Sequence, residues 1–235
     1  MKGGPRFEPN RGDVRALRHT HPLAYIIREL PARLQALSRE LHCPPDGRVV
    51  DYGCADTPYR HFFPGSVEYL AADLVGNPDA TLLLNSDGTV PVADESVDVV
   101  LSTQVLEHVA DPALYLSECR RVLRPRGRML LSTHGFMVYH PDPVDFWRWT
   151  CAGLREAVER EGLRIVRFEG IMGLRASGLQ LVQDGFLYRV PTRLRGPFAY
   201  LMQRTIAFVD RHEPAESRDM NALVFALVAE KPAQS

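Results

Sequence analysis

Short apolar stretches alternate with helical patterns along most of the chain, and this alternation limits the possible folds more than any other feature. Apolar runs typical of buried strands occupy residues 48–52, 67–72, 80–84, 97–102, 128–133, 163–168 and 221–229. Helical patterns lie between them at residues 58–63, 112–123 and 154–161. Strands that alternate with helices predict a mainly parallel sheet covered on both faces. In such sheets, ligands bind outside the carboxyl ends of the strands, where the strand order reverses.

The two flanks of this pattern differ from its centre. Apolar residues recur at spacings of three and four between Pro22 and Leu41, which predicts an amphipathic helix that Pro31 can kink or break. Residues 1–20 are rich in Gly, Pro and Arg and predict a flexible tail, so 21–235 is expected to form a single domain. Residues 170–219 predict a helical insertion before the last strand.

That insertion is apolar for a surface layer, and several roles remain open for it. It can be a lid over an acceptor pocket, a homodimer surface, a contact with lipid, or a plain added helical layer. Arg189, Arg193 and Arg195 flank Pro191 and can meet an anionic acceptor or a phospholipid.

Charge and composition exclude several classes of function. The 235-residue chain has a formal net charge of -1, and duplex binding needs a strong basic surplus, so we expect no nucleic-acid partner. No stretch approaches the roughly 20 apolar residues that span a bilayer, and the N-terminus lacks a secretory apolar region. The four cysteines show no zinc spacing. Reduced thiols and a cytoplasmic location are therefore expected.

The first predicted strand ends in a turn suited to a nucleoside ligand. Gly53 lets the chain turn sharply, and Asp73 follows 22 positions after Asp51, where a carboxylate can hold two ribose hydroxyls. A dinucleotide loop needs further glycines where this chain has Ala55 and Pro58, so the loop suits a nucleoside without pyrophosphate. The carboxylate of Asp51 repels phosphate and favours an ammonium or sulfonium group.

Four segments together resemble a known family. They are VVDYGCADTPYR at 49–60, YLAADL at 69–74, the stretch from NSDGTV to LLSTH at 85–134, and YHPDPVDFWRWT at 139–150. The chain resembles class I S-adenosylmethionine-dependent methyltransferases of the type 11 group, similar in its core to the ubiquinone/menaquinone methyltransferases. The resemblance implies an α/β fold with a doubly wound, Rossmann-like, mostly parallel seven-stranded sheet, and S-adenosyl-L-methionine as cofactor.

The family pattern also implies roles for individual residues. It places Asp51 and Gly53 near the methionine part of the cofactor, Asp73 on the ribose, and Asp87 with Gly88 near the adenine. Ala55 stands where the family usually has a second glycine. Other expected cofactor contacts are Cys54, Ala55, Tyr59, Leu74, Gln104, Glu107 and His108.

The segment after the fifth predicted strand carries the candidate acceptor site. A hydroxyl nucleophile must lose a proton, and His134 or His140 can act as its base. Expected acceptor contacts are Tyr139, Trp147, Arg148 and Trp149. His140, Asp142 and Asp145 are weaker candidates for holding a divalent ion such as magnesium.

These observations favour methyl transfer to a small-molecule acceptor, with the hydroxyl of a saccharide or another polar natural product as the leading hypothesis. Alternatives are carbon or nitrogen methylation of a quinone-like or lipid-linked acceptor, and a non-catalytic module that binds S-adenosylmethionine. A nicotinamide-dependent oxidoreductase is disfavoured by the missing glycines and by Asp51.

Overall fold

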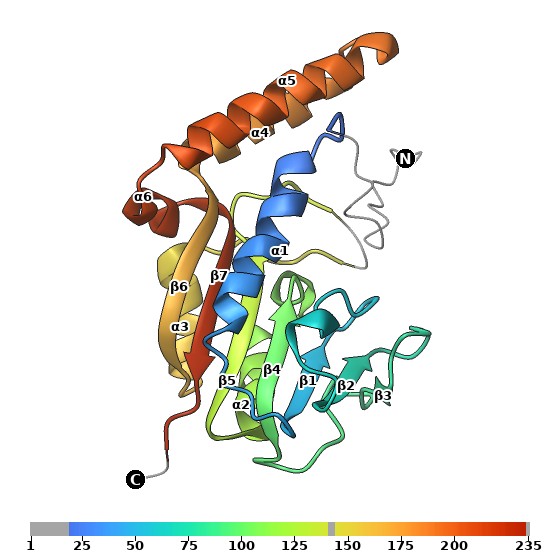
Figure 1. The fold of residues 1–235 in the computed structure, drawn as a ribbon, viewed down its shortest axis with the longest axis vertical. Helices are drawn as coiled ribbons and strands as arrows, with labels where there is room; N and C mark the ends of the chain where they lie inside the picture. Colours follow the sequence, from blue (N-terminus) through green and yellow to red (C-terminus); the bar gives the residue numbers. More distant parts are fainter. Residues whose placement is uncertain (1–18, 141–143, 234–235) are drawn as a thin grey trace.

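The apolar runs form one seven-stranded sheet in the order β3-β2-β1-β4-β5-β7-β6, seen in a computed structural model that describes residues 19–140 and 144–233 (Figure 1). The strands are β1 (Arg48–Tyr52), β2 (Glu68–Asp73), β3 (Leu82–Leu83), β4 (Val97–Thr103), β5 (Leu123–His134), β6 (Arg164–Gly173) and β7 (Ala222–Glu230). β1 to β5 are parallel, whereas β7 runs antiparallel to both β5 and β6. The predicted doubly wound, mostly parallel sheet is confirmed.

Helices cover both faces of this sheet. They are α1 (Ala24–Ser38), α2 (Pro112–Val122), α3 (Cys151–Arg160), α4 (Leu174–Leu187), α5 (Thr192–Arg211) and α6 (Ala215–Met220), with the short 3₁₀ helices η2 (Arg60–Phe62) and η3 (Leu106–His108). Neighbouring strand residues point to opposite faces. Val50 and Val100 therefore pack in the core under α2 and α3, whereas Val49 and Val99 pack in the core under α1.

Several element boundaries differ from those expected. The helix predicted at 58–63 is only the 3₁₀ turn η2, and β3 has two residues. β6 continues to Gly173, beyond the predicted end at 168, because it pairs with β7 along its length. α1 continues through Pro31, with Leu34 and Leu37 buried against the sheet on the far side of the proline. Most of the predicted tail, residues 1–18, lies outside the described residues.

The predicted insertion contains α4, α5 and α6. In Figure 1, α4 and α5 lie side by side beyond the end of the sheet, next to the start of α1. Three buried glutamine amides, from Gln180, Gln183 and Gln203, donate to the carbonyl of Pro22 at 3.1, 2.7 and 2.7 Å. These bonds join the α4–α5 hairpin to the start of α1. Among the described residues, no helix has the length and apolar character needed to cross a bilayer.

At Gly170, the backbone of β6 contacts the backbone of α6 closely, and a substitution there tests this packing. Its amide donates to Asp219 Oδ1 at 2.8 Å, and a Cβ at Gly170 would lie 1.9 Å from the Arg218 carbonyl oxygen. We expect Gly170→Ala to lower the free energy of unfolding by about 2–3 kcal/mol, measured by chemical denaturation. The control is Gly178→Ala in α4, where a Cβ meets nothing within 4 Å and helix propensity predicts a gain of up to about 1 kcal/mol. Equal unfolding midpoints for the two variants would contradict this account.

Candidate functional site

The carboxyl ends of β2, β1, β4 and β5 lie next to one another, and most predicted site residues gather along this edge. Asp51 is near the end of β1, Asp73 ends β2 and His134 ends β5. Gln104 and Glu107 follow β4 directly. The strand order reverses between β1 and β4, which is where such folds bind ligands.

Asp51 is a buried carboxylate with one oxygen left over. The residue is only 1% exposed, and its Oδ2 accepts a hydrogen bond from the Tyr69 hydroxyl at 2.5 Å. Oδ1 has no hydrogen-bond partner within the described part of the chain. Burial raises the pKa of Asp51 to about 6, and the nearby Asp73 charge acts in the same direction. The hydrogen bond from Tyr69 lowers this pKa but does not offset the burial. A buried acceptor without a partner costs stability, so the site is suited to a donor or a cation.

The turn after β1 has strained backbone. Gly53 has φ +84°, and a Cβ there would lie 2.6 Å from Val105 Cγ2, so both conformation and space require glycine. Ala55 and Thr57 also have positive φ, at 46° and 53°. A non-glycine residue in this region costs on the order of 1 kcal/mol or more, and such strain clusters at ligand sites.

Asp73 and Asn77 join the end of β2 to this turn. Asp73 Oδ2 accepts the amide of Ala55 at 3.1 Å and the Asn77 side chain at 2.7 Å, while Oδ1 accepts the amide of Leu74 at 2.7 Å. Asn77 Nδ2 also donates to the Ala55 carbonyl at 2.8 Å. Sequence reasoning missed Asn77, because an asparagine before a proline signals only a turn. Cys54 is buried, with Sγ 3.8 Å from Asp73 Oδ2.

Asp87 and Gly88 form a tight turn at the same edge. Asp87 Oδ1 accepts the amide of Thr89 at 3.0 Å and its hydroxyl at 2.7 Å. The Gly88 carbonyl accepts the hydroxyl of Tyr52, at the end of β1. The hydroxyl and amide bonds from Thr89 lower the pKa of Asp87, and the Tyr52 bond holds the turn against β1.

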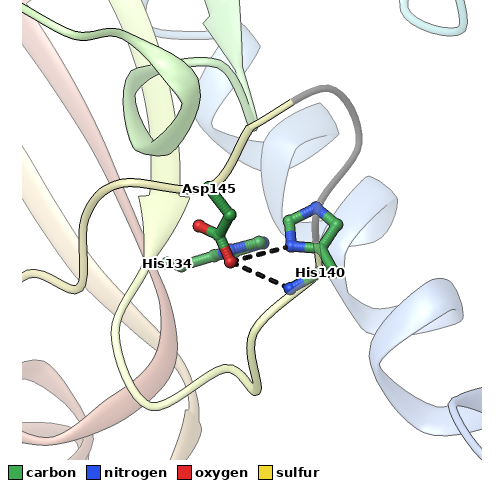
Figure 2. A group of neighbouring side chains, drawn as sticks. All are labelled: His134, His140 and Asp145. Atoms are coloured by element: carbon green, nitrogen blue, oxygen red, sulfur yellow. Dashed lines mark hydrogen bonds and ion pairs between the residues drawn. The ribbon is translucent and has the colours of Figure 1, made fainter. Parts of the chain in front are cut away.

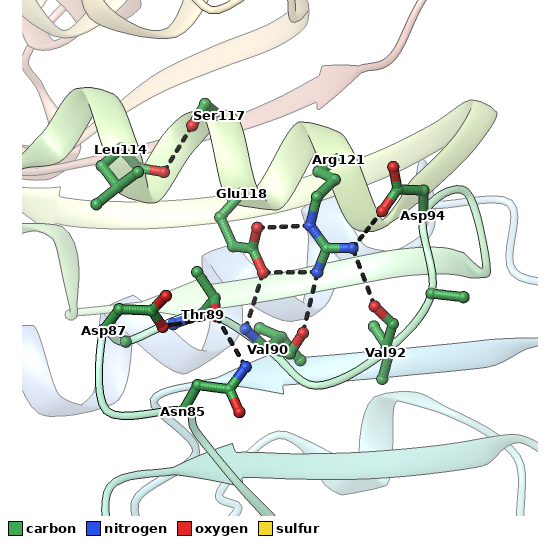
Figure 3. A network of polar contacts seen from close by, with 12 residues as sticks. Asn85, Asp87, Thr89, Val90, Val92, Asp94, Leu114, Ser117, Glu118 and Arg121 are labelled. Carbon is green, nitrogen blue, oxygen red and sulfur yellow. Dashed lines mark hydrogen bonds and ion pairs between the residues drawn. The ribbon is translucent and has the colours of Figure 1, made fainter.

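An ion pair on α2 anchors the chain that follows this turn (Figure 3). Glu118 is 5% exposed and accepts the Val90 amide at 2.8 Å and Arg121 Nε at 2.7 Å. Arg121 in turn donates to the carbonyls of Val90 and Val92, both at 3.0 Å. The Glu118–Arg121 pair therefore fixes the chain that follows the turn predicted to lie near the adenine. The sequence motifs did not identify this pair.

The remaining predicted cofactor residues have mixed surroundings. Tyr59 is buried in the core under α1, and Leu74 is 59% exposed. Gln104 has φ +58°, and its Nε2 donates to Ser132 Oγ at 3.0 Å across the ends of β4 and β5. The geometry alone assigns no ligand to these three positions.

Glu107 and His134 form a buried pair at the end of β5. Glu107 Oε2 accepts the Thr133 hydroxyl at 2.9 Å, and its Oε1 lies 3.2 Å from His134 Nε2. Burial, His140 and Arg148 lower the pKa of His134 to about 2. Its ring is therefore neutral near pH 7. Nδ1 of His134 has no hydrogen-bond partner among the residues described.

His140 lies beside a second acidic group, Asp145 (Figure 2). Asp145 Oδ2 accepts the backbone amide of His140 at 2.9 Å and lies 3.4 Å from His140 Nδ1. Burial favours a raised pKa for Asp145, but Arg148 and His140 outweigh it and hold that pKa well below its usual range. Burial and His108 lower the pKa of His140, and Asp145 partly opposes them.

All five N–H donors of Arg148 are used within its own loop. Nη1 donates to Asp145 Oδ1 at 2.5 Å and to the Trp147 carbonyl at 2.7 Å. Nη2 donates to Asp145 Oδ2 and to the Val138 carbonyl, and Nε donates to the Met137 carbonyl. A guanidinium has five such donors, so this one is fully occupied in holding Asp145 and the loop.

The histidine rings and loop residues 136–140 and 144–149 form one assembly with η3. The His140 ring packs against those of His134 and His108, with centroids 4.8 and 4.9 Å apart. His108 Nδ1 donates to the Val144 carbonyl at 2.6 Å, and Trp147 Nε1 donates to that of Val109 at 2.7 Å. This assembly is the candidate acceptor side of the edge.

Two predicted groups of this loop need separate mention. Tyr139 is 68% exposed, whereas Nε1 of Trp149 is buried and has no hydrogen-bond partner among the described residues. His134, His140 and Asp145 offer ligand atoms within 4.8 Å of one another, a possible metal cluster. The third predicted metal ligand, Asp142, lies outside the described residues.

Sequence comparison finds methyltransferases. A family model described as a methyltransferase domain matches residues 62–131. A ubiquinone biosynthesis O-methyltransferase of Cereibacter sphaeroides is 32% identical over 145 residues, which are 52% of this chain and 56% of that protein. A malonyl-(acyl-carrier protein) O-methyltransferase of Hahella chejuensis is 34% identical over 128 residues, 47% of this chain and 44% of that protein. The chain thus matches about half the length of these curated relatives.

Solved structures share the fold over more of the chain. Phosphoethanolamine N-methyltransferase 2 of Haemonchus contortus, solved in complex with S-adenosyl-L-methionine, has a TM-score of 0.53 at 14% identity, covering 97% of this chain and 61% of that one. Identity this low shows the fold alone. The sequence match therefore marks a methyltransferase domain at residues 62–131, and the structural match shows that the chain has the fold of such enzymes, both as its motifs predict.

Proposed function

We propose that this protein transfers the methyl group of S-adenosylmethionine to a hydroxyl group of a small-molecule acceptor. The residues at the β1 end fit the cofactor. Oδ1 of Asp51, which has no partner among the described residues, offers a buried acceptor for its ammonium or sulfonium group, and Gly53, with φ +84°, makes the sharp turn beside it. Asp73 ends β2, where a carboxylate can hold ribose hydroxyls.

The observation that carries the proposal is the placement of His140 against Asp145, with Arg148 holding the carboxylate. The Asp145 carboxylate bonds the backbone amide of His140 and lies 3.4 Å from Nδ1, close enough for an ion pair although Nδ1 has no hydrogen-bond partner among the described residues. With the carboxylate on the Nδ1 side of the ring, we assign Nε2 as the atom that removes the proton. His140 has a side chain 39% exposed, whereas that of His134 is 4% exposed and closed off by Glu107. We therefore assign His140 as the general base and His134 as a positioning residue.

The steps follow from these placements. When bound, the cofactor supplies an electrophilic methyl group on a positively charged sulfur. His140 Nε2 would accept the proton of the acceptor hydroxyl, while the cofactor, held by Asp51 and Asp73, would supply the methyl group to the oxygen and keep the electron pair of its carbon–sulfur bond. Asp145 stabilises the imidazolium that results, and the packed rings of His108 and His134 keep His140 in place. Positioning of this kind supplies much of the rate in a direct displacement.

The acceptor class rests on the exposed aromatic side chains of the same loop. Tyr139, Phe146 and Trp147 are 68, 51 and 39% exposed, and flat rings of this kind can stack on a saccharide or on another planar natural product. The two O-methyltransferase relatives support an oxygen nucleophile. A quinone-like or lipid-linked acceptor is the second candidate, supported by the relative from ubiquinone biosynthesis.

A divalent ion is not needed for these steps. Arg148 pairs with both oxygens of Asp145, so an ion at His134, His140 and Asp145 would have to compete with a guanidinium. If His140 removes the proton, no metal ion takes part in the reaction. We therefore expect a chelator to leave turnover unchanged, which a rate measurement with and without chelator checks.

Asp51→Asn should separate stability from cofactor binding. The folded-state pKa of about 6 lies above the ordinary value of 3.8, so above pH 6 the charged, buried carboxylate destabilises the fold. At pH 7.5 we expect the variant to gain up to about 3 kcal/mol in free energy of unfolding, and this gain should shrink as pH falls toward 3.8. Calorimetry should show cofactor affinity reduced roughly 10–100-fold, since a charge-assisted bond is lost.

The matched control is Asp46→Asn, in the exposed turn before β1, which should change neither quantity. Unchanged affinity for S-adenosylmethionine and S-adenosylhomocysteine in Asp51→Asn would remove Asp51 from the cofactor site. Absence of any binding by the parent protein would overturn the proposed function itself.

His140→Ala should lower kcat by about 10²–10⁴-fold while cofactor affinity stays unchanged, because only the proton acceptor is lost. Turnover is followed as S-adenosylhomocysteine release with a panel of saccharides, phenols and reduced quinones. Since the pKa of His140 lies below 6.5, kcat should rise with pH up to that region and then level off. Asp145→Asn removes a group that raises this pKa, so the rise should move to lower pH.

His61→Ala, on the exposed face of η2, is the control and should keep parental kcat. Parental turnover in His140→Ala, combined with loss of turnover in His134→Asn, would transfer the base to His134. Cofactor binding without turnover on any acceptor would favour the non-catalytic module.

A further inference from the structure

Helix α5 presents an apolar stripe away from the rest of the protein. Leu194, Leu201 and Phe208 recur every seven residues and are 49, 65 and 65% exposed. The opposite side of the helix carries its buried residues, Ala199, Gln203, Ile206 and Asp210. Figure 1 shows α5 as the outermost element at its end of the molecule. Three large apolar side chains in a row on an outward face are unusual for a helix that contacts only water.

The α4–α5 hairpin, residues 174–211, also concentrates positive charge. It contains the arginines 175, 189, 193, 195, 204 and 211, and its acidic residues are Asp184 and Asp210. Asp210 is 1% exposed and accepts hydrogen bonds from Tyr25 and Gly173, while Asp184 is half-buried and accepts Gln180. The exposed charge of the hairpin is therefore positive, although the whole chain has a net charge of -1.

The arginines and the apolar stripe share one surface. At about 100° per residue, Arg193, Arg204 and Arg211 fall along one flank of the stripe formed by Leu194, Leu201 and Phe208. An exposed apolar row beside a row of cations is the pattern of helices that lie in the plane of a membrane surface. The apolar side chains enter the acyl boundary there, and the guanidinium groups contact anionic headgroups.

We propose that the α4–α5 hairpin binds the surface of a bilayer containing anionic phospholipids, with α5 parallel to the membrane plane. A second copy of this chain is a poorer occupant, because it would bring two arginine-rich faces together with no exposed carboxylate within residues 174–211 to pair with them. A nucleic acid would pair with the arginines but leave the apolar stripe in water. The proposal is independent of the methyltransferase reaction.

Docking would also orient the body of the protein. Gln180, Gln183 and Gln203 bind the Pro22 carbonyl at the start of α1, and α1 packs on the sheet through Leu34 and Leu37. The hairpin is thus connected to the sheet by buried hydrogen bonds, so its contact with a membrane sets the direction that the site edge faces.

The test is co-sedimentation of the whole chain with vesicles of neutral phospholipid alone, or with about 30% anionic phospholipid, at low and high salt. We expect binding to the anionic vesicles that weakens with salt. Arg193→Gln/Arg204→Gln/Arg211→Gln should reduce binding by at least about tenfold, since each arginine near an anionic surface contributes roughly fivefold. Leu201→Ser/Phe208→Ser should reduce it to a similar degree by removing the apolar part.

Matched controls are Arg160→Gln on α3 and Leu114→Ser on α2, both exposed and remote from the hairpin, which should bind like the parent. Circular dichroism establishes that each variant is folded. Equal binding to neutral vesicles, or parental binding by both hairpin variants, would overturn the proposal. It would also be overturned if sedimentation velocity showed a dimer that Leu201→Ser/Phe208→Ser disperses, or if only nucleic acid bound in an arginine-dependent manner.

Discussion

The parallel pairing of β1 with β4 is the constraint on which the rest of the site depends. Its register, Val49↔Val99 to Asp51↔Leu101, sets the carboxyl end of β1 next to that of β4, with β2 and β5 beyond them. Segments far apart in the sequence therefore end at one edge. Because successive strand residues alternate between faces, Val49 and Val50 enter different cores while Asp51 remains buried at the edge.

The two halves of that edge differ in how their charges are compensated. On the cofactor side, Asp51 keeps a buried oxygen without a partner among the described residues and has a raised pKa, so the protein stores an unfavourable charge that a cationic ligand would relieve. On the acceptor side, Asp145 is paired with Arg148, whose five donors are all used. The acceptor loop is thus organised before any ligand arrives, which favours a fixed orientation for His140.

Local patterns predicted the fold well because periodicity and turn residues act over a few positions. Asp111 begins α2 by accepting an amide three residues on, as a short polar residue before an apolar run predicts. Thr150 does the same for α3, which begins at Cys151 and not at residue 154 as predicted. The sequence did not predict the full length of β6, since its last residues form a strand only because they pair with β7. Asn77 and Glu118 escaped notice for a related reason, because each acts through partners distant in sequence, Ala55 and Val90.

By itself, the sequence determined the strand–helix alternation, the Gly53 turn with its flanking acidic residues, and the presence of two histidines after the fifth strand, because these depend on residue type and short spacing. Only the tertiary structure decided that each histidine lies beside a carboxylate, and that the His140 ring is partly exposed whereas His134 is enclosed by Glu107. It also decided that the arginines and apolar residues of α5 share one outward face. Burial and pairing are properties of the assembled chain, and they alone set the pKa values and the free surfaces on which function depends.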